Sequence, residues 1–260
     1  MNNLVHLNGK VSRRGAKQAS HGFTLIEVLI SMTIALFLLG GLLTVVQSTK
    51  NAFATQNQLA SLQDNQRLAM TFMAEVVESA GYYPDPIIPA NTAASFFPVD
   101  TPKGFTTAGQ VFYGTSGGAK LDSITVRFGV KPSDIGLFGC NGKGNTTAAN
   151  DTLVSKFSVV TVNGIKQLIC TFSNNTTPAT DVTLVNGVRS LTVLYGVTRN
   201  AGPSLGSCAD TYLTTALMLS ADWLKVCSVH LRLEFDNPLD TANPITINRL
   251  VAAMQTAGVN

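Results

Sequence analysis

An uncharged apolar stretch near the amino terminus constrains this chain more than any other feature. Between Glu27 and Lys50 lie 22 residues without a charged side chain. A helix of about 20 apolar residues spans the roughly 30 Å hydrocarbon layer of a bilayer. The stretch therefore predicts a membrane-spanning helix and argues against a wholly soluble cytoplasmic protein.

Basic residues are concentrated ahead of this stretch. The 260-residue chain carries a net charge of +3, yet removing residues 1–22 leaves 14 basic and 15 acidic residues, a net charge of −1. Positive residues beside a spanning helix stay in the cytoplasm, so we expect everything after the helix to be exported. The remaining chain shows no excess of basic residues for nucleic acid, and no direct nucleic-acid binding is predicted.

A single helix is predicted to continue beyond the membrane. No proline occurs in residues 23–83, and after the apolar stretch the apolar residues recur at three- and four-residue steps. This spacing predicts one helix over residues 23–80, amphipathic in its second half and ending at Gly81. Gly40 and Gly41 each cost about 1 kcal/mol relative to alanine in a helix interior, so bending or melting is expected there.

The rest of the chain is predicted to form β-structure. Asn163-Gly164 favours positive φ and predicts a hairpin between two of the strands. Because few helix-length segments separate the strands, we expect an α+β fold in which an antiparallel sheet packs on the amphipathic half of the helix. The predicted strands are Val111–Tyr113, Ser123–Val130, Phe157–Val162, Gln167–Phe172, Arg189–Tyr195, Val226–Phe235 and Thr246–Ala252.

Four cysteines lie in the part predicted to be exported, namely Cys140, Cys170, Cys208 and Cys227. An exported chain with an even number of cysteines and no C-x-x-C pair favours disulfides over zinc. Three connectivities are possible. Sequential pairing closes the shortest loops and is favoured, which gives Cys140 with Cys170 and Cys208 with Cys227.

No residue pattern points to catalysis, a metal or a cofactor. His230 is the only histidine after the leader, and it lies in an alternating strand that places it toward solvent. Ser220, Asp222 and His230 could form a triad, although nothing in their spacing demands one. The glycines of residues 136–144 lack the spacing of a phosphate-binding loop and are interpreted as a surface loop. Tyr212 is interpreted as a core or partner-facing residue, like Trp223.

The residues at the helix start resemble a known signal. Gly22-Phe23-Thr24-Leu25-Ile26-Glu27, behind a short basic leader, is similar to the class III prepilin signal of type IV pilins and pseudopilins. Residues 62–69 and 78–82 resemble the helix end of the PilW minor pilins. The carboxy-terminal positions that resemble that family are Val188, Leu191, Tyr195, Gly196, Tyr212, Trp223 and Val226.

The resemblance implies how the amino terminus is processed. Prepilin peptidase would cut between Gly22 and Phe23, and Phe23 would be N-methylated. Glu27 would meet the amino terminus of a neighbouring subunit during assembly. The implied parts are a leader (1–22), a transmembrane and filament-core helix (23–49), an amphipathic half-helix (50–82) and a periplasmic head (83–260).

The resemblance also implies a function and partners. The chain would be a minor pilin of a type IV pilus, serving pilus assembly, twitching motility, adhesion or DNA uptake. Its partners would be other pilins, prepilin peptidase, the inner-membrane assembly platform and an adhesin at the tip. A minor pseudopilin of type II secretion and a membrane-anchored periplasmic binding module or enzyme are the alternatives. Because residues 197–200 lack the acids found in relatives, no calcium site is predicted there.

Overall fold

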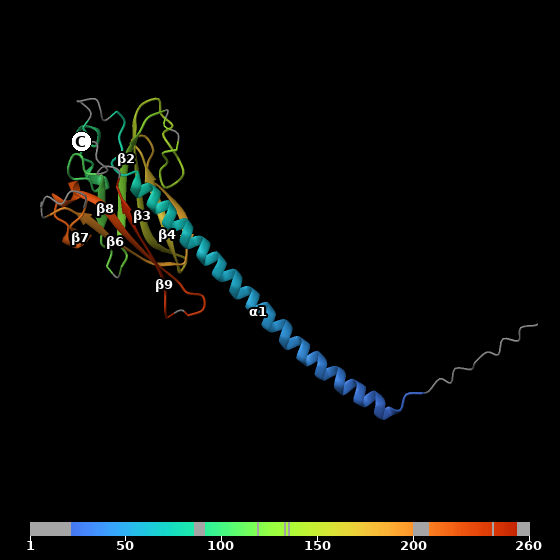
Figure 1. Ribbon diagram of the computed structural model, residues 1–260. Helices are drawn as coiled ribbons and strands as arrows, with labels where there is room; N and C mark the ends of the chain where they lie inside the picture. Colours follow the sequence, from blue (N-terminus) through green and yellow to red (C-terminus); the bar gives the residue numbers. More distant parts are fainter. Residues whose placement is uncertain are drawn as a thin grey trace, which may run out of the picture. The chain divides into compact units, whose positions relative to one another are not determined.

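The computed structural model describes residues 22–85, 92–118, 120–132, 134, 136–199, 208–240 and 242–253. Figure 1 shows a long helix and a β-rich head in these residues. The chain divides into two compact units, of which the first ends at Phe53 and the second begins at Ala54. The predicted leader lies almost entirely outside the described residues, apart from Gly22.

The long helix, α1, runs from Leu25 to Glu78, so the prediction of one helix through both segments is confirmed. Gly81 follows in the left-handed conformation with φ 78°, which glycine adopts without a steric cost. Its backbone N–H donates to the carbonyl of Arg127 at 3.1 Å. The carbonyl of Tyr82 accepts a hydrogen bond from Gly129 at 2.6 Å, so the end of the helix is tied to the head.

The second unit contains two antiparallel sheets instead of the single sheet that the sequence predicts. The five-stranded sheet has the order β1 (Phe112–Thr115), β2 (Ser123–Val130), β3 (Asp151–Val162), β4 (Ile165–Ser173), β5 (Thr180–Asn186). The four-stranded sheet has the order β7 (Thr211–Thr214), β6 (Val188–Val197), β8 (Val226–Phe235), β9 (Ile245–Ala252).

The chain changes sheets at a single residue. Gly187, with φ 76°, separates β5 from β6, and the next strand pairs with β8. Alternating apolar residues report which face of a strand is buried but not which strand lies beside it. The single-sheet prediction was wrong for this reason.

Several local predictions were confirmed and others were incomplete. Asn163 and Gly164 have φ of 51° and 79° and connect β3 to β4 as the predicted hairpin. The strands β5 and β7 were not predicted, and β3 begins at Asp151, six residues before the predicted Phe157. The described helices besides α1 are short: α2 (Ala93–Phe96), η1 (Thr101–Lys103), η2 (Thr215–Leu217) and η3 (Asp222–Leu224).

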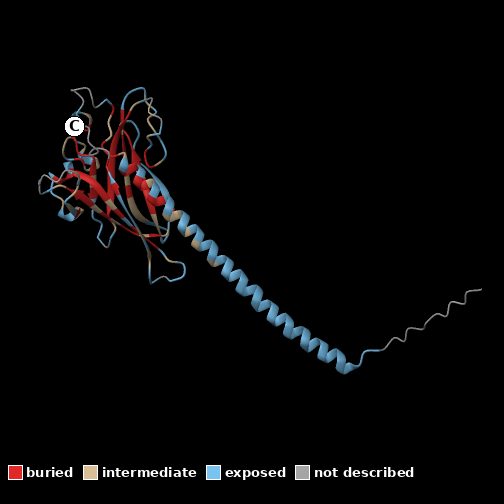
Figure 2. Cartoon of the chain, in the orientation of Figure 1, coloured by how far each residue is buried: buried red, intermediate tan, exposed pale blue. Residues whose placement is uncertain are grey.

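The second half of α1 enters the core of the head, as predicted. Figure 2 shows buried residues at this end of the helix and along the strands of the head. One apolar cluster joins helix residues to strands of both sheets. The buried residues of α1 are Ala69, Met70, Met73, Ala74, Val76 and Val77.

Candidate assembly site

The bond expected to be cut lies just ahead of α1, in non-helical backbone. Gly22 and Phe23 are both exposed, and 80% of Phe23 is accessible. Thr24 precedes the helix, and its carbonyl and hydroxyl oxygens accept the backbone N–H of Glu27 at 3.1 and 3.4 Å. This cap satisfies a backbone amide at the helix start. The Gly22–Phe23 peptide bond therefore lies outside the helix, in exposed backbone that a protease can bind.

Glu27 lies in the first turn of α1, where the helix dipole favours a negative charge. Its side chain is exposed, and within the described part of the chain it forms no ion pair. The following residues are apolar and exposed on every side of the helix. The described residues therefore supply no counter-charge to this carboxylate.

The first half of α1 is long and apolar enough to cross a membrane. An 18-residue window within it has a mean hydropathy of 2.4, and none of that window is buried by the protein. Gly40 and Gly41 lie inside this segment, and an added Cβ at either glycine would have open space for 4 Å beyond the local helix. They remain helical, so the predicted melting at these glycines stays a prediction.

A buried arginine fixes the loop between α2 and β1, and the sequence analysis did not identify it. Arg127 is 2% exposed, and its guanidinium donates to the carbonyls of Gln110, Pro98 and Phe97 at 2.6, 2.7 and 3.3 Å. It lies 4.1 Å from the ring centroid of Phe105, a favourable cation–π distance. Burial lowers the pKa of Arg127 to about 10, so it stays charged at neutral pH. An arginine within the apolar strand Ser123–Val130 was the available signal.

The structure joins the cysteines in the pairs that the sequence favours. Cys140 is bonded to Cys170, which ties the loop after β2 to β4. Cys208 is bonded to Cys227, which ties the segment before β7 to β8. Each bridge closes a loop and lowers the entropy of the unfolded chain.

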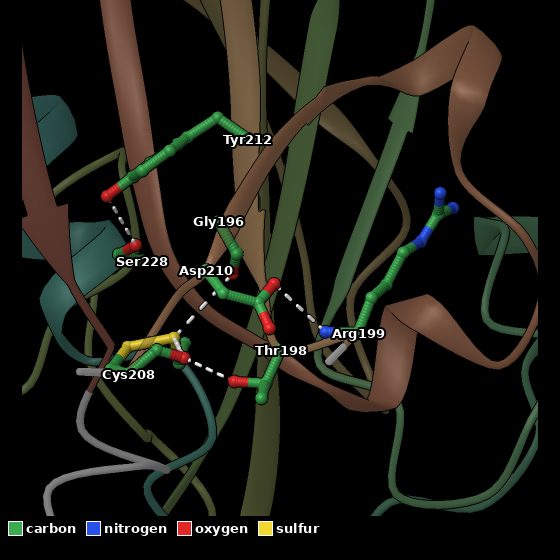
Figure 3. The surroundings of a disulfide bond; sticks show 8 residues. Gly196, Thr198, Arg199, Cys208, Asp210, Tyr212 and Ser228 are labelled. Atoms are coloured by element: carbon green, nitrogen blue, oxygen red, sulfur yellow. Dashed lines mark hydrogen bonds between the residues drawn. A yellow bond between two sulfur atoms is a disulfide. The ribbon is translucent and has the colours of Figure 1, made fainter. Parts of the chain in front are cut away.

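The second disulfide lies beside a polar cluster (Figure 3). The hydroxyl of Thr198 donates to the carbonyl of Cys208 at 2.6 Å, and the Arg199 backbone N–H donates to Asp210 at 3.1 Å. Tyr212 and Ser228 share a hydroxyl hydrogen bond of 3.2 Å. These bonds hold the start of β7 against β6 and β8.

An ion pair between Arg199 and Asp222 links the end of β6 to η3 in the same region. The Arg199 guanidinium contacts both carboxylate oxygens of Asp222, and the Leu219 backbone N–H donates to one of them at 2.8 Å. The hydrogen bond from Arg199 is the main reason that the pKa of Asp222 lies below its usual value of 3.8. Asp222 is therefore a structural ion-pair partner.

Three other residues were candidates from the sequence, namely Trp223, Tyr212 and His230. Trp223 is 8% exposed and packs edge-on against Tyr195 at 4.9 Å between ring centroids, whereas Tyr212 is 43% exposed. His230 is half-buried in β8, opposite Leu194 of β6. Within the described residues, no group of three or more His, Cys, Asp or Glu side chains could hold a metal ion.

The long apolar helix, its capped start with an acidic first turn and the disulfide-bonded antiparallel head together define a type IV pilin-like protein. Comparison with known families agrees. Residues 17–43 match the prokaryotic N-terminal methylation motif, and residues 156–246 match the type IV pilus-assembly protein W family, PilW. These two matches support a type IV pilin-like protein whose residues 156–246 are similar to the PilW family. A comparison with individually curated proteins finds no match.

Proposed function

We propose that the protein is a minor pilin, a structural subunit that helps to initiate or cap a type IV pilus. The observation that carries this proposal is the presence, in one chain, of the methylation motif over residues 17–43 and the PilW match over residues 156–246. The first belongs to the processed amino terminus and the second to the head. A structural role needs no catalytic centre.

The proposal assigns a role to each part of the chain. Residues 1–22 are a leader removed by prepilin peptidase, and residues 23–49 cross the inner membrane and later enter the filament core. Residues 50–82 are the amphipathic half of the helix, and residues 83–260 form a periplasmic head. After assembly the subunit lies in the pilus at the cell surface.

Glu27 supplies the charge that guides assembly. A carboxylate costs a few kcal/mol within a membrane helix unless it finds a partner. The new amino terminus of a neighbouring subunit, at Phe23, carries the complementary positive charge. Pairing the two removes an unfavourable charge from each subunit, so this contact favours addition to the filament over free diffusion in the bilayer.

The proposed partners are other major and minor pilins, the inner-membrane assembly platform and an adhesin at the tip. Through them the subunit would serve twitching motility, adhesion or DNA uptake. A type II secretion pseudopilus uses the same amino-terminal motif, and the match of the head to the pilus-assembly family favours the pilus.

The first test is intact-mass spectrometry with amino-terminal sequencing of protein from membranes and from sheared surface filaments. We expect a chain that begins with N-methylated Phe23 in both fractions. A chain that retains residues 1–22 in cells with an active prepilin peptidase would contradict the proposal and indicate an anchored binding module. Processed protein that is absent from pili but present in a secretion pseudopilus would assign it to the other machine.

The second test separates processing from assembly. Glu27→Ala should leave cleavage largely intact and reduce the amount of the subunit in sheared pili. Glu75→Ala removes the same exposed carboxylate from the head half of α1 and serves as the matched control. Normal incorporation of Glu27→Ala, or an equal loss in both variants, would refute the charge-pairing role.

A further inference from the structure

A cleft of about 290 Å³ opens on the outer face of the five-stranded sheet. Residues 101–104 form one wall, and side chains of β1 to β4 form the floor. All of these residues belong to the second unit, so the cleft is separate from the amino-terminal assembly site. Its volume is near the lower end of the roughly 300–1,000 Å³ range of small-molecule sites, which limits the ligand to a small group.

The wall of the cleft belongs to the loop between α2 and β1, and contacts with the sheet hold this loop in place. Arg127 binds three carbonyl oxygens at the two ends of the loop, at Phe97, Pro98 and Gln110. Gly104 has φ 91°, and an added Cβ would lie 2.1 Å from the ring of Tyr113. Only glycine allows this approach, so the wall is set against the sheet at a fixed distance.

The strand register places five side chains in one row across the sheet. Tyr113 is opposite Thr125, Thr125 is opposite Lys156, Lys156 is opposite Thr171, and Thr171 is opposite Asp181. Residues directly opposite each other in antiparallel strands project from the same face at about 5 Å. An aromatic ring, a hydroxyl, an amino group and a second hydroxyl therefore follow one another along the cleft.

Three side chains at the cleft have unused hydrogen-bonding groups. Thr125 and Ser173 are only 5% and 7% exposed, yet neither hydroxyl bonds to another described residue. Lys156 likewise forms no ion pair or hydrogen bond with the part of the chain that the structure describes. The Thr125 and Ser173 hydroxyls are not among the enclosed polar atoms of the described residues, so they open to the cleft, where water or a ligand can bond them.

The charges around the cleft favour a single negative group. Lys103 is paired with Asp100 at 2.9 Å, which leaves Lys156 as the available amino group on the floor. Asp181, at the far end of the row, accepts the hydroxyl proton of Thr171 at 2.6 Å. A bound anion would therefore lie toward Lys156 and away from Asp181.

We propose that this cleft binds a carboxylate-bearing saccharide unit, such as a uronic acid. Lys156 would pair with the carboxylate, and the hydroxyls of Thr125 and Ser173 would bond the sugar hydroxyls. Tyr113 would contact the apolar edge of the ring. The biological meaning of this binding rests on the adhesion role of the proposed function, but the binding itself requires neither processing nor filament assembly.

The test uses the full-length chain in detergent and measures binding by titration calorimetry. The probes are sodium glucuronate, glucose and inorganic phosphate. We expect glucuronate to bind and glucose to bind at least tenfold more weakly, because glucose lacks the carboxylate that pairs with Lys156. Lys156→Gln should weaken glucuronate binding by a similar factor.

Two further variants keep the result interpretable. Lys143→Gln removes the same charge from an exposed loop and should leave glucuronate binding unchanged. Thr125→Val keeps the shape of a buried side chain and should weaken the binding of glucuronate and glucose alike.

Absent glucuronate binding, or equal binding by Lys156→Gln, would overturn the proposal. Phosphate binding as tight as glucuronate would also overturn it, since the site would then recognise anions and not a saccharide. Normal pilus incorporation alongside any of these results would leave the minor-pilin assignment intact.

Discussion

The two halves of α1 form one continuous helix, yet their side chains require different surroundings. From Leu25 to Phe53 every described side chain is exposed, and the apolar ones cover all sides of the helix. From Ala69 to Val77 only one face is apolar, and that face is buried in the head. A helix that is apolar all round needs a membrane or other helices, whereas an amphipathic helix finds its partner in its own chain. Folding of the chain therefore buries the apolar face of the second half. The apolar side chains of the first half are left to be covered by lipid or other pilins.

The largest expected effect is a loss of head stability when a methionine in the second half of α1 is replaced by alanine. The same replacement in the first half is the comparison. Met73→Ala should lower the free energy of unfolding of the head by about 2–5 kcal/mol, because Met73 is fully buried and alanine leaves a cavity. Met32→Ala, at a position 63% exposed, should leave that free energy unchanged. Urea unfolding of the full chain in detergent, followed by Trp223 fluorescence, measures both. Equal losses in the two variants would contradict the division of α1 into two environments.

Removing a disulfide should lower the stability of the head and leave the membrane half of α1 helical. Replacing Cys140 and Cys170 together by serine frees a 30-residue separation and should cost about 3–4 kcal/mol of head stability. Replacing Cys208 and Cys227 frees a 19-residue separation and should cost slightly less. Circular dichroism in detergent should still show the membrane half as helical. A loss of helix from both halves would instead mean that the head maintains the whole of α1.

Acid should weaken the head through a carboxylate whose pKa is lowered. The hydrogen bond from Arg199 holds the pKa of Asp222 below 3.8, so near that pH the unfolded chain binds a proton that the folded chain does not. The stabilisation is complete above pH 3.8 and is lost as the pH falls through the lower folded pKa. Asp222→Asn should flatten the loss of head stability as the pH falls below 3.8, measured by urea unfolding.

Asp64→Asn is the matched control for this prediction. Asp64 is exposed on α1 and forms no ion pair within the described residues. This variant should keep the acid dependence of the unaltered chain. An unchanged slope in Asp222→Asn would show that the Arg199 pair contributes nothing to acid sensitivity.

The smallest effect is expected in the membrane half. Gly40→Ala and Gly41→Ala should each stabilise the helix by about 1 kcal/mol, because alanine loses less backbone freedom and has open space at both positions. Amide hydrogen exchange in detergent should slow around these residues, while exchange and unfolding of the head stay the same. Unchanged exchange would show that the glycines are not a weak point of the helix.

Local sequence patterns were sufficient for much of the fold. The uncharged stretch, the proline-free periodic segment and Gly81 predicted the long helix, because helix formation depends on neighbours along the chain. Ser123–Val130 and Val226–Phe235 were predicted with the observed bounds, since both are rich in β-branched or apolar residues. Strand β7 has only four residues, too few for an alternating pattern to be recognised, whereas β5 was missed although four of its seven residues are β-branched.

Residues close together in the chain were enough to establish the amino-terminal signal, the membrane half of α1 and a head with paired cysteines, because each of these depends on local composition and spacing. The division into two sheets, the burial of Arg127 beneath the α2–β1 loop and the row of side chains from Tyr113 to Asp181 emerged only in three dimensions. These features join residues far apart in the chain, and their stability comes from register and packing that no local pattern records.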